Sequence, residues 1–444
     1  MNYNDFFALA ENKGINRIQV TETYIKQNEI QFIDKNLEKY NISEHLDYYI
    51  KAERNNKTEK VRTDYLDESI IDLLIMKLDE TDSNYEDDYL KKKKTMKLQE
   101  PDENDSSEEL EKLSRIYKLK KISDKILKIE SFYEEYSERI RIINNLGTDI
   151  SSNKKIYSFA SEVIIDENGV PSTYDKSIIK TEKGIINFEQ FTKNVISEGL
   201  IISKKEDIET KKYNILLSKN VAGNILAHMI EMLSATNIRL KTSCMENKIN
   251  KTIFSNKISI IEEPTNKLYP GYRLFDDEGT ETKEKYIIKN GNLLTYLSNI
   301  KEAKLQNKES TGNGYSQISA RNMHIIEGTI SHDKLLKELN DGLYITDYMG
   351  ASATAISQTT GNISLQIFGF IVENGKIKCG FTPSIMTTNI FELFSNIQEI
   401  GNEIDFTRLS SASPELLIKN ISIAGKKKIT IYKNVNKNIS QRVV

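Results

Sequence analysis

Cysteine is scarce in this chain of 444 residues, which contains only Cys244 and Cys379. A secreted protein of this size more often carries a denser, even set of cysteines for disulfide bonds, so we expect a reducing compartment. No apolar run approaches the length of about 20 residues that a helix needs to cross a bilayer. The first residues show no basic segment followed by an apolar one, which predicts no signal peptide. These absences together predict a cytoplasmic protein without a membrane span.

The chain also lacks an excess of charge of either sign. It has 62 Lys and Arg residues against 65 Asp and Glu residues, which gives a net charge of -3. A protein that mainly binds nucleic acid usually presents a strongly basic face, so this composition argues against that class. Hydrophobic residues make up 38% of the chain, which is enough to form buried cores. The length exceeds that of a usual single core and predicts two or three domains.

The order of the predicted elements indicates an α+β protein of several domains. We expect a small N-terminal α/β unit and a large C-terminal domain, built on an extensive and mostly antiparallel sheet with flanking helices. The predicted parts are an N-terminal domain at 1–80, a charged linker at 81–109, a central domain at 110–213 and the C-terminal domain at 214–444. The linker assignment rests on mixed charge, including Lys91–Lys94 beside acidic clusters, and on few large apolar residues.

Local signals predict individual helices, strands and turns. Asn-Gly pairs at 168–169, 290–291 and 374–375 are typical of tight β-hairpins. Apolar periodicity and capping residues predict helices. The expected helices are Asp5–Lys13, one starting near Asp67, a helical period over Leu110–Leu146, Asn187–Gly199, one after Ser218, one from Ser331 to Gly342, and Asn389–Ile400. Early strands are expected at Arg17–Ile25, Glu29–Ile33 and Leu46–Ala52.

Two polar loops flank the second Asn-Gly hairpin and are candidates for a peptide-binding cleft. The first is the acidic turn Asp276-Asp277-Glu278-Gly279, whose carboxylates could hold a hard cation or the amino terminus of a peptide. The second contains Thr311, Gly312 and Asn313, whose backbone N–H groups could bind a peptide carboxylate or carbonyl. The alternative for the first loop is a structural turn that closes a strand. The second is not a phosphate-binding loop, because no Gly-Lys-Ser/Thr sequence follows it.

Several phrases of the sequence, in this order and spacing, resemble the TldD/PmbA family, also called TldD/TldE, whose members were once described as modulators of DNA gyrase. The phrases are Phe275–Gly279, Ile288–Leu293, Ser310–Gly314, Gly369–Lys376, Thr388–Gly401 and Pro414–Gly425. The resemblance covers nearly the whole chain. It implies a two-subunit zinc peptidase that processes peptides. One type of subunit carries a His-Glu-x-x-x-His helix and a later cysteine ligand, and its PmbA-like partner lacks them.

The resemblance can be tested on the helix that follows Ser218. His228 stands where the first zinc ligand would be expected. Met229 stands at the position of the catalytic glutamate, and Leu233 at that of the second histidine. The stretch Gly401–Ser413, near the expected cysteine ligand, contains no cysteine. A catalytic zinc needs three protein donors, an open position and a carboxylate to activate water, so we expect no zinc and no catalytic residue in this chain.

A contrary interpretation remains open for the same helix. Asn224, His228 and Glu231 fall on one helical stripe, and a His-x-x-Glu pair on a helix can bind a metal. His228 and Glu231 are therefore weak candidate metal ligands, against the alternative of a polar face packed on water or a partner chain. Cys244 has no evident base beside it and is interpreted as a structural thiol rather than a nucleophile.

Two functions follow from the resemblance and these departures from it. The first is a PmbA/TldE-like, non-catalytic subunit of a cytoplasmic TldD/PmbA-type metallopeptidase complex, which processes peptides with zinc supplied by a TldD-like partner. The second is a standalone peptide-binding protein without protease activity. The expected partners are a TldD-like catalytic subunit or a second copy of this chain, together with a peptide substrate, and neither membrane nor nucleic acid.

Overall fold

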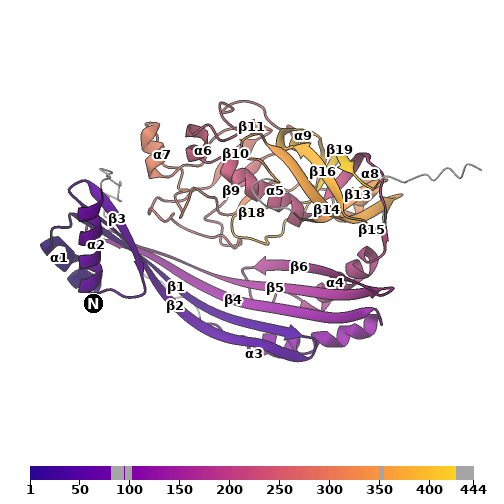
Figure 1. The fold of residues 1–444 in the computed structure, drawn as a ribbon, viewed down its shortest axis with the longest axis horizontal. Coiled ribbons are helices and arrows are strands. Elements are labelled where there is room, and N and C mark those ends of the chain that lie inside the picture. The colour runs from indigo at the N-terminus through magenta and orange to yellow at the C-terminus, as the bar shows by residue number, and fades with distance from the viewer. Residues whose placement is uncertain (82–94, 96–102, 350–354, 427–444) are drawn as a thin grey trace, which may run out of the picture.

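The computed structural model describes residues 1–81, 95, 103–349 and 355–426. These residues form a long curved sheet and a C-terminal body that lies against it and contains two further sheets (Figure 1). The protein is therefore an α+β protein with several sheets, as the order of elements predicts. We call residues 205–425 the C-terminal body below.

The curved sheet has six antiparallel strands in the order β3-β2-β1-β4-β5-β6. Its strands are β1 (Arg17–Ile33), β2 (Asn36–Arg54), β3 (Lys57–Thr63), β4 (Ile126–Asn144), β5 (Asp149–Glu167) and β6 (Val170–Lys180). Strand β1 pairs with β4 along most of its length, from Gln19 opposite Asn144 to Ile33 opposite Glu130. The predicted boundary between domains 1–80 and 110–213 is therefore wrong, because the two segments share one sheet. Local sequence signals do not indicate this pairing, since β1 and β4 lie far apart along the chain.

Helices cover the two ends of this sheet. Helices α1 (Tyr3–Asn12) and α2 (Glu68–Glu80) pack around Phe6 and Ile71 at one end. Helix α3 (Ser107–Leu113), the 3-10 helix η1 (Ile116–Ile122) and α4 (Phe188–Ile202) pack at the other. Most of the predicted linker lies outside the described residues. Its last residues are not a solvated linker, because Ser106 and Glu109 are buried and α3 begins at Ser107.

The helical period predicted over Leu110–Leu146 is correct only in its first part. Leu113, Ile116 and Leu119 do lie on the buried side of α3 and η1. The chain then changes to β4, whose buried face alternates through residues such as Ser131, Tyr133, Glu135 and Ser137. Because polar residues occupy several of these buried positions, hydrophobic alternation is not visible in the sequence.

An eight-stranded sheet forms the centre of the C-terminal body, in the order β13-β8-β19-β16-β14-β15-β7. Strand β13 also pairs with β14, so β13, β8, β19, β16 and β14 form a closed ring, and β17 pairs with β19. The strands are β7 (Lys205–Glu206), β8 (Lys211–Leu217), β13 (Gly342–Met349), β14 (Asn362–Glu373), β15 (Lys376–Phe381), β16 (Ser384–Asn389), β17 (Ile397–Ile400) and β19 (Leu416–Ala424). Most pairs are antiparallel, as predicted.

A smaller five-stranded sheet, β11-β10-β9-β12-β18, packs beside this ring. Its strands are β9 (Ile260–Glu262), β10 (Lys285–Lys289), β11 (Asn292–Leu293), β12 (Met323–Ile325) and β18 (Ser411–Ala412). The helices of the body are α5 (Lys219–Met232), α6 (Ala235–Arg239), α7 (Ile300–Leu305), α8 (His332–Leu339) and α9 (Ile390–Ser395). The apolar face of α5 supplies Ile225, Leu226 and Met229 to the main core.

The short-range sequence signals agree well with these elements. Asn168, Asn290 and Asn374 have positive φ angles, as tight hairpin turns require. Asn187 and Ser218 cap α4 and α5 through their side chains. The helix predicted over Asn389–Ile400 is too long, because it ends at Ser395 and its last residues form β17 instead. Among the described helices, none combines the length and the hydropathy that a membrane crossing requires.

Candidate functional site

Helix α5 carries the candidate metal ligands on one side and core residues on the other. The Ser218 hydroxyl accepts a hydrogen bond from the backbone N–H of Val221 at 3.3 Å and so fixes the first turn. Met229 and Leu233 are fully buried in the main hydrophobic core. The two positions at which the resemblance would require a carboxylate and an imidazole are therefore apolar and point into the core, away from any solvent-filled site.

His228 lies on the polar side of α5 and is half buried. Burial lowers the pKa of its imidazole, and the positive charge of Arg408 lowers this pKa further, while the carboxylate of Glu231 opposes the shift. Arg408 comes from the segment that the resemblance aligns with the cysteine ligand. A guanidinium beside a candidate ligand repels a zinc cation, so the surroundings of His228 do not suit a metal.

The side chains near His228 and elsewhere do not form a metal-ligand set. Among residues 1–81, 95, 103–349 and 355–426, no group of three or more His, Cys, Asp or Glu side chains could hold a metal ion. Cys379 is buried in β15, and Cys244 has its Sγ 3.7 Å from the sulfur of Met232. Burial raises the pKa of both thiols, which favours the unreactive protonated form. His228 and Glu231 remain a pair without a third donor.

The two polar loops predicted to line a cleft meet each other, and Asp276 and Asn313 are buried between them. Asp276 has no exposed surface, and its carboxylate accepts backbone hydrogen bonds from Thr280 at 2.9 Å and from Gly314 at 2.8 Å. Burial raises the pKa of Asp276 to about 7, in spite of these donors. Asp277 forms an ion pair with Arg273 at 2.6 Å. The acidic turn thus fastens one loop to the other.

The second loop is used in the same structural way. Asn313 is fully buried and donates hydrogen bonds to the carboxylate of Glu262 at 2.9 Å and to the carbonyl of Ser319 at 2.8 Å. The hydroxyl of Thr311 accepts the backbone N–H of Ser298. Gly312 has φ +73° and lies against the backbone of Glu281, which leaves no room for a side chain. The cleft role is therefore wrong for Asp276 and Asn313, because a buried polar group in a tight turn is already satisfied by its neighbours.

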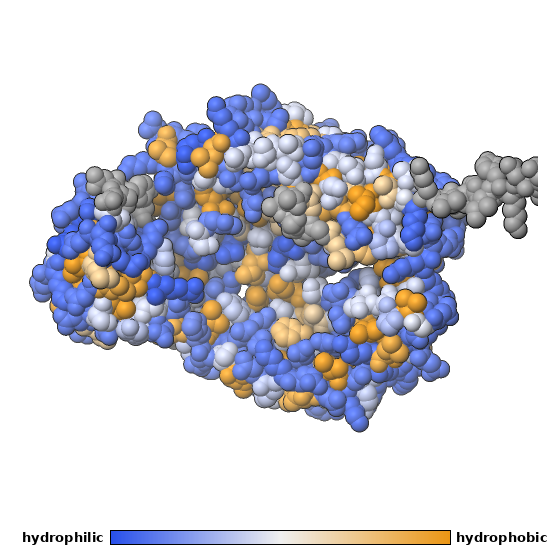
Figure 2. All heavy atoms as spheres, in the orientation of Figure 1, coloured by the Kyte–Doolittle hydropathy of each residue, from blue (hydrophilic) through white to orange (hydrophobic). Residues whose placement is uncertain are grey.

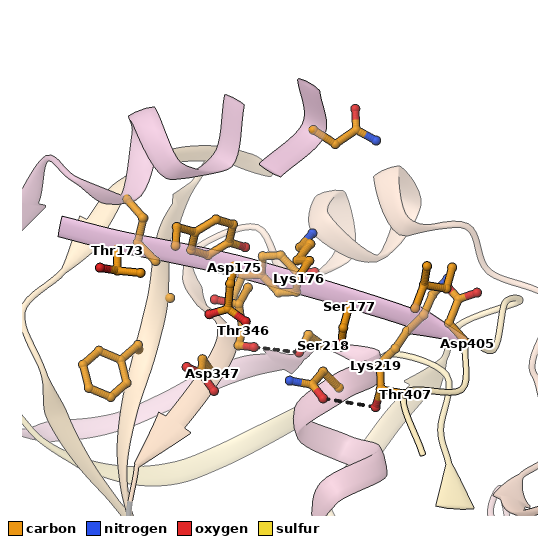
Figure 3. A pocket seen from close by; sticks show the side chains of 18 of the residues that line it. Thr173, Asp175, Lys176, Ser177, Ser218, Lys219, Thr346, Asp347, Asp405 and Thr407 are labelled. Carbon is orange, nitrogen blue, oxygen red and sulfur yellow. Dashed lines mark hydrogen bonds and ion pairs between the residues drawn. The ribbon is translucent and has the colours of Figure 1, made fainter. Parts of the chain in front are cut away.

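A different site is formed where the curved sheet meets the C-terminal body. The surface is hollowed between these two parts, and hydrophobic side chains are visible in the hollow (Figure 2). A cavity of about 520 Å³ lies there, lined by β6, the first turn of α5, β13 and the loop before β18. β6 crosses one side of this cavity, opposite Thr346 and Asp347 of β13 and Ser218 at the start of α5 (Figure 3).

Strand β6 presents a free edge to this cavity. It is the last strand of the curved sheet, and it pairs with β5 without a register shift. The N–H of Ile179 points away from β5, because it donates to the carbonyl of Phe406 at 3.0 Å. In an antiparallel ladder every second residue shares this orientation. Thr173, Asp175 and Ser177 therefore direct their backbone N–H and C=O groups out from the sheet, and Pro171, which has no N–H to lose, occupies the same series.

The charged groups of the cavity are arranged in two zones. Burial raises the pKa of Asp175 and of Asp347, and the charge of Asp175 raises that of Asp347 further. Near the start of α5, Lys219 lies 2.8 Å from Asp405 and 2.9 Å from Glu403. Their carboxylates hold the pKa of Lys219 above its usual value, although burial acts in the opposite direction. One zone is thus acidic, and the other contains balanced ion pairs.

Comparison with known proteins relates this architecture to a known family. The family model described as PmbA/TldA metallopeptidase C-terminal domain matches residues 210–425. Residues 210–425 therefore belong to the PmbA/TldD family. One relative is a protein of Buchnera aphidicola subsp. Acyrthosiphon pisum that is named metalloprotease PmbA homolog. It is 26% identical over 303 residues, and the match covers 64% of this chain. The match covers 66% of that relative, so the chain spans about two thirds of its length.

Solved structures share the fold of this chain over almost its whole length. A Thermotoga maritima protein described as a modulator of a DNA gyrase superposes with a TM-score of 0.83 at 23% identity, covering 95% of this chain and 99% of the other. TldE from Thermococcus kodakarensis gives a TM-score of 0.82 at 16% identity, covering 95% and 99%. At these identities the likeness shows a shared fold.

In this chain with its PmbA/TldD-type C-terminal domain, sequence reasoning identified the altered helix but missed the cavity. The residues that line the cavity come from positions near 175, 219, 346 and 405, and no local motif joins them. Arg408 was also missed, because an arginine in a polar loop is ordinarily a surface residue. Pro171 offered the one readable signal, since proline within a strand marks an edge.

Proposed function

We propose that this chain is the PmbA/TldE-like, non-catalytic subunit of a cytoplasmic TldD/PmbA-type metallopeptidase complex. A TldD-like partner would supply the zinc and the catalytic carboxylate. The observation that carries this proposal is the composition of α5, where Met229 and Leu233 are buried in the core and the positive charge of Arg408 acts on His228. These groups do not supply the three protein ligands and the carboxylate that a water-activating zinc ion needs.

The subunit would contribute a surface for an extended peptide. The free edge of β6 offers backbone donors and acceptors along a cavity that the chain forms by itself. Such an edge can add one more strand through main-chain hydrogen bonds, which depend little on the peptide's sequence. The acidic pair Asp175 and Asp347 would favour a basic side chain at the neighbouring position of the peptide.

The second candidate function is a standalone peptide-binding protein. The same observation about β6 supports it, because the whole cavity belongs to one chain. The two candidates differ in whether the protein assembles with a catalytic relative.

The experiment is co-expression of this chain with a TldD-like protein from the same genome, followed by purification through a tag on this chain. A stable complex that contains zinc and cleaves peptides, while this chain alone does neither, supports the subunit function. A lone chain that never associates with its relative, yet binds unstructured peptides, supports the standalone function.

A further inference from the structure

Arg408 is a partly buried cation that has no anionic partner among the residues that the structure describes. Its Nε atom is buried and has no hydrogen-bond partner. No carboxylate among residues 1–81, 95, 103–349 and 355–426 forms an ion pair with it, although Lys219 and Lys180 both pair with Asp405, three residues earlier in the same loop. A guanidinium that is taken from water without a partner costs free energy, so its retention here points to an anion that binds from outside the chain.

The groups around Arg408 show which kind of anion fits. On α5, Asn224 donates to the side-chain oxygen of Asn220 at 3.4 Å, and the Thr407 hydroxyl also donates to that oxygen at 3.4 Å. The side-chain oxygen of Asn224 is itself buried and accepts no hydrogen bond. The charge of Arg408 acts on His228, one turn further along α5, and on Tyr348 of β13. The site therefore combines an unused donor on Arg408 with an unused acceptor on Asn224.

We infer that Arg408 and Asn224 form a binding site for the C-terminal residue of a peptide. The terminal carboxylate accepts hydrogen bonds from the Arg408 guanidinium, and the backbone N–H of the same residue donates to the Asn224 oxygen. A free, fully ionised anion such as sulfate could pair with Arg408, but it has no donor for the Asn224 oxygen. A metal cation is excluded by the charge of Arg408.

The position of the site relative to β6 supports a chain end. Asn220 and Thr407 line the cavity, so the Arg408 site adjoins it. Beyond Ser177 the edge of β6 is already occupied, because Phe406 pairs with Ile179 there. A peptide added along Thr173–Ser177 cannot continue past this point and must stop beside Phe406 and Thr407, directly before Arg408 in the chain. Its C terminus then points in the direction of β6, which makes the added strand parallel to β6.

This inference deepens the proposed function, since it names the substrate class as peptides with a free C-terminal carboxylate. The test uses the full chain and an eight-residue unstructured peptide that carries a fluorophore on its amino terminus. Fluorescence anisotropy compares the free-acid peptide with the same peptide amidated at its C terminus. We expect the free acid to bind about tenfold more tightly, the effect of one charge-assisted hydrogen bond. Equal affinities, or no binding of either peptide, would overturn the inference.

Variants separate the guanidinium from other causes of this preference. R408Q should remove the difference between acid and amide, whereas R62Q, at an exposed arginine paired with Asp47, should leave it unchanged. A preference that persists in a folded R408Q protein contradicts the inference. If R408Q does not fold, the comparison is made with R408K, which retains the charge but loses the planar fork and should reduce the preference.

A third peptide distinguishes a chain end from a side-chain carboxylate. An amidated peptide with glutamate as its last residue should bind as weakly as the other amide, because its carboxylate is displaced from the backbone N–H that Asn224 requires. Recovery of full affinity would overturn the assignment to a terminus. The proposed subunit function would be contradicted by a different result, the lack of a complex with a TldD-like chain. Failure of this inference can therefore be distinguished from failure of the proposed function.

Discussion

At the scale of single residues, three side chains determine what α5 and the loop before β18 can do. Met229 and Leu233 turn one side of α5 into core, and the positive charge of Arg408 acts on His228. The sequence alone predicted the first of these features, because the resemblance assigns a role to each position of the helix. It did not predict the second, because a loop arginine has no periodicity that would indicate burial.

Asp276 gives the first prediction at this scale. Its carboxylate accepts three backbone N–H groups, from Glu278, Thr280 and Gly314. Removing it by D276A leaves these buried donors without an acceptor, which should lower the free energy of unfolding by about 3 kcal/mol. The exposed substitution E284A in the same region should change it by roughly 0.5 kcal/mol or less. Chemical denaturation measures both, and similar effects of the two variants would show that the turn is not structural.

At the scale of elements, the N-cap of α5 can be compared with that of α8. Ser218 accepts the N–H of Val221 and donates to the carbonyl of Thr346, whereas Ser331 makes no side-chain capping hydrogen bond. S218A should therefore destabilise the protein by about 1–2 kcal/mol, and S331A by clearly less. Thermal unfolding of the two variants provides the measurement. An equal loss in both would mean that the cap of α5 contributes nothing specific.

The free edge of β6 gives a second prediction for an element. In T173P the proline replaces an N–H that points out from the sheet, so the ladder with β5 is kept and the fold is retained. In the matched variant S172P the proline removes an N–H that faces β5, so the sheet is destabilised. T173P should thus bind an unstructured peptide several-fold more weakly while staying folded. Unchanged peptide affinity in T173P would argue against strand addition at this edge.

Sequence reasoning was most accurate for elements whose signals are local. Asn168-Gly169 fixes the β5–β6 hairpin because both residues must adopt positive φ, and Ser218 marks the start of α5 by its own hydrogen bond. It failed for β4, whose buried face includes Ser131 and Glu135. Such a strand is stable only because β1 and β5 form backbone hydrogen bonds with it on both sides. That pairing is a property of the whole sheet.

At the scale of the whole molecule, buried charges join the curved sheet to the C-terminal body. Glu138 of β4 lies 3.0 Å from Lys154 of β5, and Arg273 of the body contributes a second positive charge. Burial by itself would raise the pKa of Glu138, but the charges of Lys154 and Arg273 together lower it to about 2. The folded state thus holds this carboxylate ionised well below the pH at which the unfolded chain takes up a proton.

This pair predicts how stability depends on pH. Because the folded pKa of Glu138 is depressed, its contribution is fully present above about pH 4.5 and is lost as the pH falls towards 2. E138Q should therefore be less stable than the wild type at pH 7, and the difference should shrink on acidification. The exposed substitution E38Q should show no such trend. Urea unfolding at several pH values measures it, and a difference that grows towards low pH would contradict the assigned pKa.

The central claim, that this chain is a subunit without its own catalytic metal, is tested most directly by native mass spectrometry with metal analysis. The chain is measured alone, as the H228A variant, and after mixing with a TldD-like chain, with peptide cleavage assayed in each sample. We predict no bound zinc and no cleavage for the chain alone, no effect of H228A on zinc content, and a zinc-containing active complex with the partner. One tightly held zinc per isolated chain that is lost in H228A, together with peptide cleavage by the isolated chain, would contradict the account.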